Sequence, residues 1–232
     1  IYQKAFRAMQ GSPEEYELER AVLGGKAGLE DPAVMEAAKS FLAKNAQTLE
    51  LLCEATAVPR CRFEVDWSAG YDLVFYQHAN LRECARMLEL RSMVLAREGD
   101  PEAALEAGMT ALRMSAAAEE PVAIGPLTRY AIIPMGTRAI ANALWSGPPS
   151  AAACRRAASE IGEIDLTPGF VRALKGERAL GISTIEKVRG ADDPVSAIGM
   201  MNSGADDSEA AIARGPAARW VAYRRVCEDE LI

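Results

Sequence analysis

The side chains that catalysis needs are scarce in this sequence. The chain of 232 residues contains one histidine, His78, so a serine or cysteine nucleophile would depend on that residue as its base. No Gly-x-Ser-x-Gly elbow occurs, and a single histidine excludes zinc and di-iron motifs built on two histidines. We therefore predict no catalytic residue and no metal site. His78 is expected to be a polar residue at a helix start or hydrogen-bonded under the extended segment 60–67.

Two further patterns contain residues that could bind phosphate or cations. Residues 24–28, Gly-Gly-Lys-Ala-Gly, hold a lysine among glycines, but no Ser or Thr follows the lysine and no strand precedes the run. This pattern predicts a left-handed glycine turn after a helix. The carboxylate pair Glu160 and Glu163 and the cluster 228–230 could serve acid–base chemistry or bind a cation, but on surface helices we expect them to be solvated. No cofactor and no enzymatic activity are predicted.

The first candidate binding segment is the run from Arg60 to Trp67, in which charged and apolar residues alternate. One side carries Arg60, Arg62, Glu64 and Asp66, and the other side carries Cys61, Phe63, Val65 and Trp67. A period of two predicts an extended segment with one buried face. Since no second strand is predicted, we expect a strap that lies across helices and buries Trp67. The alternative is a recognition surface in which Arg60 and Arg62 act with Asp66.

Arg91 is the second candidate, on the flank of an apolar stripe. A charged group at the edge of a buried surface needs a carboxylate partner or a polar cleft. Two interpretations stay open, a structural ion pair or an arginine that faces a ligand in a groove between helical hairpins. The candidate binding residues are therefore Arg60, Arg62, Asp66, Trp67 and Arg91.

The elements that position these residues are predicted to be helices, because N-cap residues followed by proline recur along the chain. These starts are Ser12-Pro13, Asp31-Pro32, Asp100-Pro101, Thr167-Pro168 and Asp193-Pro194, with Ser150 as a further cap. We predict helices over residues 1–10, 13–24, 32–57, 72–98, 101–118, 121–145, 151–163, 168–189 and 207–231. Short connections predict antiparallel hairpins, and Pro134 predicts a kink. The whole chain, 1–232, is predicted to form one domain with a mobile loop near 190–207.

The helix expected at 72–98 has the clearest periodicity. Its narrow apolar face carries Leu81, Cys84, Ala85, Leu88, Ser92 and Leu95, widened by Met87, Leu90 and Val94. The residues predicted to point away are Arg82, Glu83, Arg86 and Glu89. This pattern predicts a central helix that is covered on more than one side.

Composition excludes several classes of function. Half of the residues are hydrophobic and 25% are charged, as in globular proteins, and the net charge of −7 argues against a nucleic-acid partner. The most apolar stretch, 121–145, contains Arg129 and Arg138, so no membrane contact is predicted within this chain. Both chain ends look cut or processed, and a targeting segment before Ile1 stays open. Five cysteines do not form a disulfide framework, and Cys53 and Cys61 are either bridged or two buried thiols.

The stretch 81–115 resembles a tetratricopeptide-type helical hairpin. The resemblance rests on the turn Glu98-Gly99-Asp100-Pro101-Glu102-Ala103-Ala104-Leu105 and on small or apolar residues at Leu88, Ser92, Leu95, Ala104 and Ala111. Arg91 and Gly108 depart from the pattern, because the family usually has large apolar residues there, and a closing proline is missing at Ala116. The resemblance implies hairpin packing of the tetratricopeptide kind.

Most of the chain is also similar to a family of uncharacterised bacterial proteins. The residues that carry this similarity are the string from Pro59 through Trp67, the Leu-Arg-x-x-Ala-Arg run from Leu81, and Gly176-Glu177-Arg178-Ala179-Leu180-Gly181. The similarity implies an all-helical protein, with an anchor or export signal before the globular part, on the extracytoplasmic side of a bacterial envelope.

The sequence therefore predicts an all-α protein of stacked antiparallel hairpins with one extended strap. Because hairpin packing creates concave surfaces and no catalytic group of residues is found, we expect a scaffold that binds a protein or peptide partner in a groove. The alternative is a sensor or carrier with a small-ligand pocket between helices, under the 60–67 strap.

Overall fold

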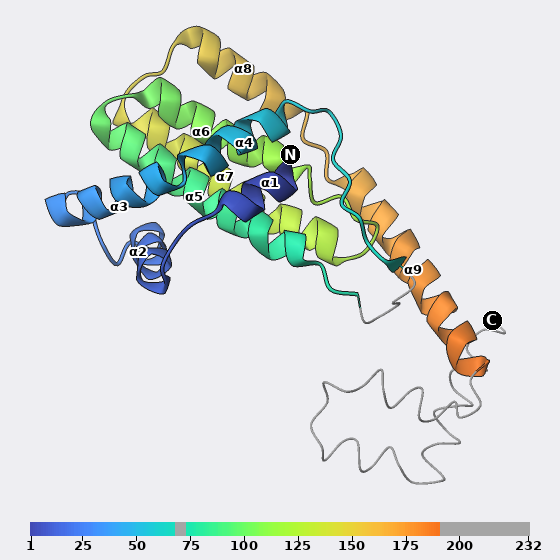
Figure 1. The fold of residues 1–232 in the computed structure, drawn as a ribbon. Coiled ribbons are helices and arrows are strands. Elements are labelled where there is room, and N and C mark those ends of the chain that lie inside the picture. Colours follow the sequence, from blue (N-terminus) through green and yellow to red (C-terminus); the bar gives the residue numbers. More distant parts are fainter. Residues whose placement is uncertain (68–72, 191–232) are drawn as a thin grey trace. The chain divides into compact units, whose positions relative to one another are not determined.

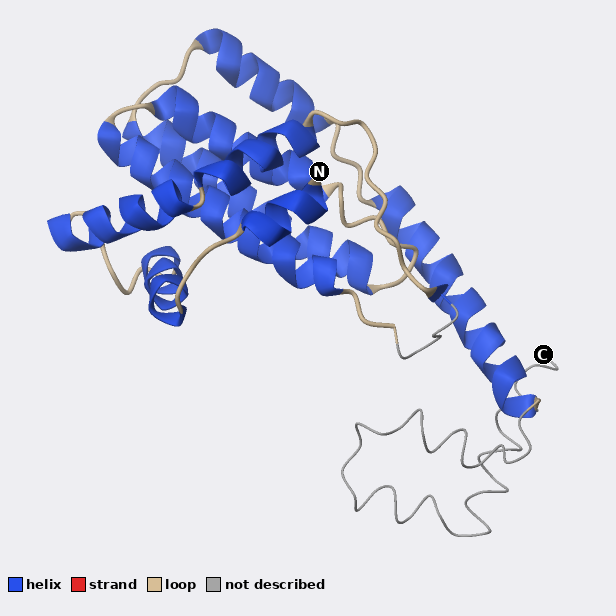
Figure 2. Ribbon diagram, viewed as in Figure 1, coloured by secondary structure: helices blue, strands red, loops and turns tan. Residues whose placement is uncertain are grey.

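The protein is all-α, as predicted. The computed structural model describes residues 1–67 and 73–190, and across these residues it contains helices and loops but no strand (Figure 2). The helices are α1 (Tyr2–Ala8), α2 (Pro13–Leu23), α3 (Pro32–Lys44), α4 (Ala46–Thr56), α5 (Tyr76–Glu98), α6 (Pro101–Ser115), α7 (Ile124–Ser146), α8 (Ala151–Gly162) and α9 (Thr167–Arg189). The helix predicted at 207–231 and the loop near 190–207 lie outside the described residues, apart from Gly190.

The chain divides into two compact units. The first consists of residues 1–64 and 75–173, and it contains α1 to α8 and the first turns of α9. The second consists of residues 65–74 and 174–232.

Helices α5, α6 and α7 form the centre of the first unit (Figure 1). The α5–α6 connection is the short turn at Gly99 and Asp100, where Gly99 has a left-handed φ of 82° that favours glycine. Helices α6 and α7 run antiparallel, because Gly108 lies against Ile140 while Leu112, one turn later, lies against Gly136. The predicted hairpin arrangement of these helices is therefore what the structure contains.

Glycine allows α6 and α7 to approach closely. A Cβ atom added at Gly108 would stand 2.9 Å from the backbone nitrogen of Ile140, and one at Gly136 would stand 3.1 Å from the carbonyl oxygen of Gly108. Real Cβ atoms do not tolerate backbone at the first of these distances, so the crossing requires the small residue. This contact gives a reason for Gly108, where the tetratricopeptide pattern has a large apolar residue.

The predicted continuous helix 32–57 is wrong, because Asn45 divides it into α3 and α4. The Asn45 side chain is buried and its amide donates to the carbonyl oxygens of Gln10, at 2.7 Å, and Phe41, at 2.9 Å. Its Oδ1 atom accepts from the backbone N–H of Gln10, at 2.9 Å. A side chain that satisfies the backbone of a distant loop outweighs the propensity of the surrounding residues for one long helix.

The predicted capping residues largely hold their places. Ser12, Asp31, Asp100 and Ser150 each accept a backbone N–H from the first turn of the following helix. Thr167 differs, because α9 begins at this residue and the side chain of Asp165 accepts its N–H at 2.9 Å. The predicted cap Asp193 lies outside the described residues. Side-chain capping thus marks the starts of α2, α3, α6 and α8, whereas α1, α4, α5 and α7 begin without a side-chain cap.

The burial pattern of α5 follows the predicted stripe in part, since Glu83 and Arg86, predicted to point away, are half-buried. Residues from Leu81 to Val94 supply most of its buried apolar surface, and the thiol of Cys84 is buried among them. Glu89 was predicted to point away but is buried, because the guanidinium of Arg138 on α7 binds its two carboxylate oxygens at 2.6 and 2.9 Å. A bidentate arginine satisfies a carboxylate that periodicity alone assigns to the solvent.

The strap is extended and forms no ladder, in agreement with its alternating sequence. Arg60, Arg62 and Glu64 are exposed, whereas Phe63 is buried against Tyr2 and Phe6, with ring centroids 6.1 and 6.0 Å away. The predicted burial of Trp67 is wrong, since 39% of this residue is exposed. The alternation of exposed and more buried residues therefore continues along the strap as far as Asp66, and it ends at Trp67, the last residue of the strap.

Candidate functional site

A groove runs along α5 and is closed on its other side by α3 and α4. We call it the α5 groove, and its volume is about 290 Å³. Its lining residues are Lys39 and Leu42 of α3; Ala46, Leu49 and Glu50 of α4; and Arg91, Val94, Leu95 and Glu98 of α5. The α5 residues follow a spacing of three, one and three, which places them on one helical face. Asn45 separates α3 from α4, which follow one another along this side of α5 (Figure 1).

Apolar side chains form the floor of the α5 groove. Leu42, Leu49 and Val94 are buried, and Leu95 is half-buried beside them. A partner that covered this floor would remove apolar surface from water, which is the main favourable contribution to association.

The charged groups of the α5 groove are not equally paired. Lys39 contacts the carboxylate of Glu98 at 2.6 Å, and this ion pair joins α3 to α5 at one end of the groove. Arg91 is half-buried, and among the residues that the structure describes no carboxylate lies within ion-pair distance of it. Of the two interpretations of Arg91, the structural ion pair is therefore not what the structure contains.

Several neighbouring arginines of this bundle, unlike Arg91, are paired with carboxylates. Carboxylate partners are present at Arg86, Arg97, Arg113 and Arg138. These arginines belong to the same three central helices as Arg91. Four arginines of α5, α6 and α7 are thus held by carboxylates, whereas Arg91 lies in a groove where a ligand could reach it.

A second hollow, the strap hollow, lies where the strap passes α1 and α4. Its volume is about 330 Å³, and its lining residues are Ile1, Tyr2, Gln3, Ala55, Val58, Arg60, Cys61, Arg62, Phe63 and Glu64. Arg60 and Arg62 are thus brought to one hollow, as the recognition alternative requires. Asp66 and Trp67 are exposed residues of the second unit, and Arg91 lies in the α5 groove. The five predicted binding residues do not form a single site.

His78 is buried near the start of α5 and faces Glu120. The His78 Nε2 atom lies 3.3 Å from Glu120 Oε2, while Gln77 donates to Glu120 Oε1 at 2.8 Å. Burial lowers the pKa of His78, and the Glu120 carboxylate opposes that shift. The expectation of a polar residue held at a helix start is confirmed. His78 and Glu120 thus join the start of α5 to the segment between α6 and α7.

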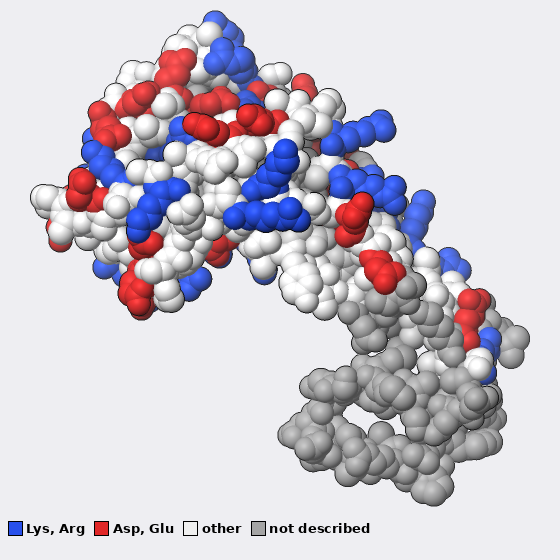
Figure 3. All heavy atoms as spheres, in the orientation of Figure 1, with Lys and Arg blue, Asp and Glu red and all other residues white. Residues whose placement is uncertain are grey.

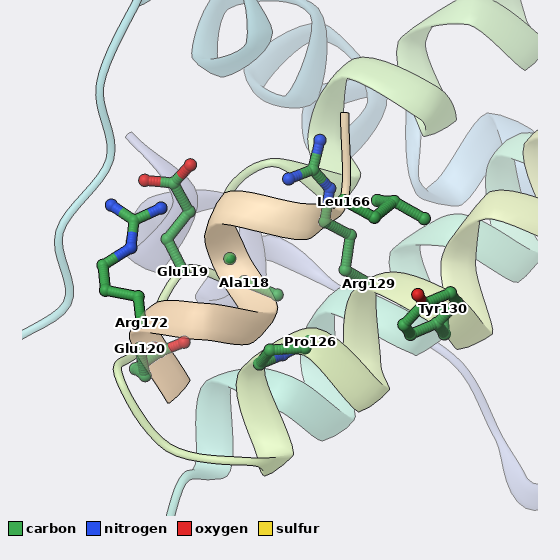
Figure 4. Close-up of a pocket in the computed structure, with 9 residues that line it drawn as sticks. Ala118, Glu119, Glu120, Pro126, Arg129, Tyr130, Leu166 and Arg172 are labelled. Atoms are coloured by element: carbon green, nitrogen blue, oxygen red, sulfur yellow. The ribbon is translucent and has the colours of Figure 1, made fainter. Parts of the chain in front are cut away.

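A small hollow adjoins Glu120 at the start of α9, and Figure 4 shows its lining side chains. It includes Glu119, Arg129, Tyr130 and Arg172, but its volume is only about 10 Å³, enough for roughly one water molecule. In Figure 4 the guanidinium groups of Arg129 and Arg172 lie on either side of the first turns of α9. They do not converge, so this hollow is too small and too divided to hold a ligand.

The other motifs noted in the sequence have structural roles in the part of the chain that the structure describes. Gly25 has a φ of 69°, so residues 24–28 contain the predicted left-handed glycine turn. Glu160 receives two hydrogen bonds from Arg113, at 2.6 and 3.0 Å, and this contact lowers the pKa of its carboxyl. Cys53 and Cys61 are free thiols, with Cys53 exposed and not buried. Residues 228–230 lie outside the described part.

The surface offers no region dominated by one sign of charge on the face shown in Figure 3, where small acidic and basic groups alternate. In residues 1–67 and 73–190, no cluster of three or more His, Cys, Asp or Glu side chains is arranged to hold a metal ion. The same residues include no helix with the length and apolar content required to cross a bilayer.

Comparison with protein-family models, with curated proteins and with solved structures finds no match to this chain. The α5 groove is therefore identified from its geometry. Sequence reasoning found Arg91 through its place beside an apolar stripe, but it missed Lys39, Leu42 and Leu49. Their contribution depends on how α3 and α4 pack against α5, and local spacing carries no signal for that packing.

Proposed function

We propose that this protein is a non-enzymatic helical scaffold that binds a protein or peptide partner in the α5 groove. The observation that carries the proposal is the combination of an apolar floor with Arg91, which has no carboxylate partner in the described residues. Interfaces place apolar side chains and arginine at their energetic centres, so these residue types suit a protein partner better than a reaction.

The α5–α6 hairpin is the rigid part of this proposed scaffold. Its turn at Gly99 and Asp100 and its buried small residues support packing of the tetratricopeptide kind. All four α5 residues in the groove, Arg91, Val94, Leu95 and Glu98, lie within that hairpin stretch of 81–115. A rigid helix face presents binding residues in fixed positions, which lowers the entropic cost of association.

Filling the α5 groove tests the proposal. Ala46 is exposed and lines the groove, so Ala46→Trp places a bulky side chain there without replacing a core residue. Ala43, also exposed, lies on α3 and is absent from the groove lining, so Ala43→Trp is the matched control. The probes are peptides selected from a random display library for binding to the 232-residue chain. We expect these peptides to bind the Ala46→Trp variant at least about tenfold more weakly than the wild type. Their affinity for the Ala43→Trp control should be unchanged. Equal binding to both variants in fluorescence anisotropy would contradict the proposed function.

A second candidate function is a small-ligand carrier that uses the strap hollow. Its volume of about 330 Å³ falls in the range of small-molecule sites, and Arg60 and Arg62 could bind an anionic ligand. Val58 lines this hollow and is 47% exposed, so Val58→Trp would fill it. Loss of peptide binding in Val58→Trp, with binding retained in Ala46→Trp, would favour the strap hollow over the α5 groove.

A further inference from the structure

We propose that the α5 groove recognises a short segment in which a carboxylate stands next to aliphatic side chains. This inference rests on the proposed function and names the chemistry of the partner. It is carried by the charges of the groove, the length of the groove along α5 and its apolar floor.

The charges of the α5 groove leave one open cationic position. The ammonium of Lys39 is neutralised by Glu98, at 2.6 Å, so it offers little to an additional anion. Arg91 is half-buried, and its guanidinium has no carboxylate within ion-pair distance in the described part of the chain. A partly desolvated guanidinium gains most from a carboxylate, which can accept two parallel N–H hydrogen bonds.

Glu50 is the one feature of the groove that opposes an acidic partner. Its exposed carboxylate lines the same groove but does not pair with Arg91. An incoming carboxylate would meet the field of Glu50 as well as that of Arg91. Removal of the Glu50 charge should therefore strengthen binding of an acidic segment, whereas it should weaken binding of a basic one.

The length of the groove limits the segment that fits. Arg91 and Glu98 are seven residues apart on α5, which at about 1.5 Å per residue separates them by roughly 10 Å along the helix. This distance accommodates about three residues of extended chain or two helical turns. The carboxylate would lie at the Arg91 end, and the aliphatic side chains would cover Leu42, Leu49 and Leu95.

The single open arginine also favours a peptide carboxylate over a nucleic-acid backbone. Binding of a phosphate backbone requires several basic groups along a surface, and the chain has a net charge of −7. The groove combines one cation with an apolar floor. That combination matches an acidic residue, or a chain-terminal carboxylate, adjacent to Leu, Ile or Val.

The test uses peptides selected from the display library on the full chain and resynthesised with each Asp or Glu replaced by its amide. Groove-dependent binders are the peptides that bind Ala46→Trp more weakly than Ala43→Trp. We expect these peptides to share a carboxylate beside an aliphatic residue. Arg91→Ala should weaken their binding at least about tenfold. Replacing the peptide carboxylate by its amide should weaken binding to the wild-type protein by a similar factor. The same replacement should change binding to the Arg91→Ala variant little, because the partner of the carboxylate is already absent. Glu50→Gln should strengthen binding.

Arg97→Ala is the matched control, because Arg97 is on the same helix, is paired with Glu30 and lies outside the groove lining. Thermal melts should show that Arg91→Ala folds normally, since it breaks no ion pair within the described residues. Groove-dependent binders that lack a carboxylate, or that bind Arg91→Ala as well as wild type, would overturn this inference and leave the proposed function standing. The absence of any groove-dependent binder would overturn both.

Discussion

At the scale of single residues, the most unusual group is a carboxyl buried between α2 and α5. Glu19 is 1% exposed, and the nearest cation, Arg86, keeps its Nε atom 3.8 Å away while also pairing with Glu83. Burial raises the pKa of Glu19 to about 8, and the Glu83 carboxylate adds to the increase, whereas Arg86 and Arg20 oppose it. Glu19 is therefore held in its protonated form in the folded protein near neutral pH.

The consequence is a loss of stability as the pH rises. The unfolded chain releases the Glu19 proton near the usual value of 4.5, and the folded chain releases it near 8, so the folded state is favoured at low pH and loses that advantage between these values. We expect the melting temperature to fall by at least roughly 3 °C between pH 5 and pH 9 on account of Glu19. Glu19→Gln should remove this part of the pH dependence and melt higher than wild type at pH 9.

Circular-dichroism melts over this pH range check the prediction. Glu17→Gln is the control, because Glu17 occupies an exposed position on the same helix. The groups that face Glu19 are Tyr16 and Arg20 from α2 and Glu83 and Arg86 from α5. Parallel pH curves for wild type and Glu19→Gln would mean that Glu19 is ionised in the fold.

At the scale of elements, the tightest constraint is the crossing of α6 and α7. Gly108 and Gly136 face each other across this crossing, and Ile140 and Leu112 fill the space beside them. The helices gain packing area because no Cβ atom separates them. Ser92 of α5 adds a hydrogen bond to the carbonyl oxygen of Ala139 on α7, at 2.9 Å.

Gly108→Ala should therefore destabilise the protein, although alanine has the higher helix propensity. The added methyl group would meet the Ile140 backbone nitrogen at 2.9 Å, and overpacking of this kind costs about 1–3 kcal/mol. Gly162→Ala on α8 is the control, because no atom lies within 4 Å of the added Cβ, and it should be neutral or slightly stabilising. Urea denaturation measures both, and equal midpoints would show that the crossing can relax.

Helix starts could be predicted from the sequence because their signals are local. Ser12, Asp31, Asp100 and Ser150 cap helices through contacts with residues two or three positions away. The interruption at Asn45 could not be predicted, since its partner Gln10 is 35 residues distant. Glu89 was misplaced for the same reason, because its partner Arg138 lies on another helix.

At the scale of the whole molecule, the fold class was predictable and the site was predictable only in part. Caps and periodicity lead to an all-α fold, and one of the predicted binding residues, Arg91, lies in the α5 groove. The remaining walls of the groove come from α3 and α4, whose division depends on Asn45. Trp67 was misplaced because alternation continues in the sequence to a residue that the structure exposes.

The central claim is that a partner binds in the α5 groove, and an NMR titration tests it most directly. Backbone amide spectra of the isotope-labelled chain would be recorded while a display-selected peptide is added. The account predicts the largest shifts at Leu42, Ala46, Leu49, Arg91 and Leu95, which line one groove although they come from three helices. Shifts centred instead on the strap hollow, at Cys61 and Phe63, with the α5 groove unchanged, would contradict it.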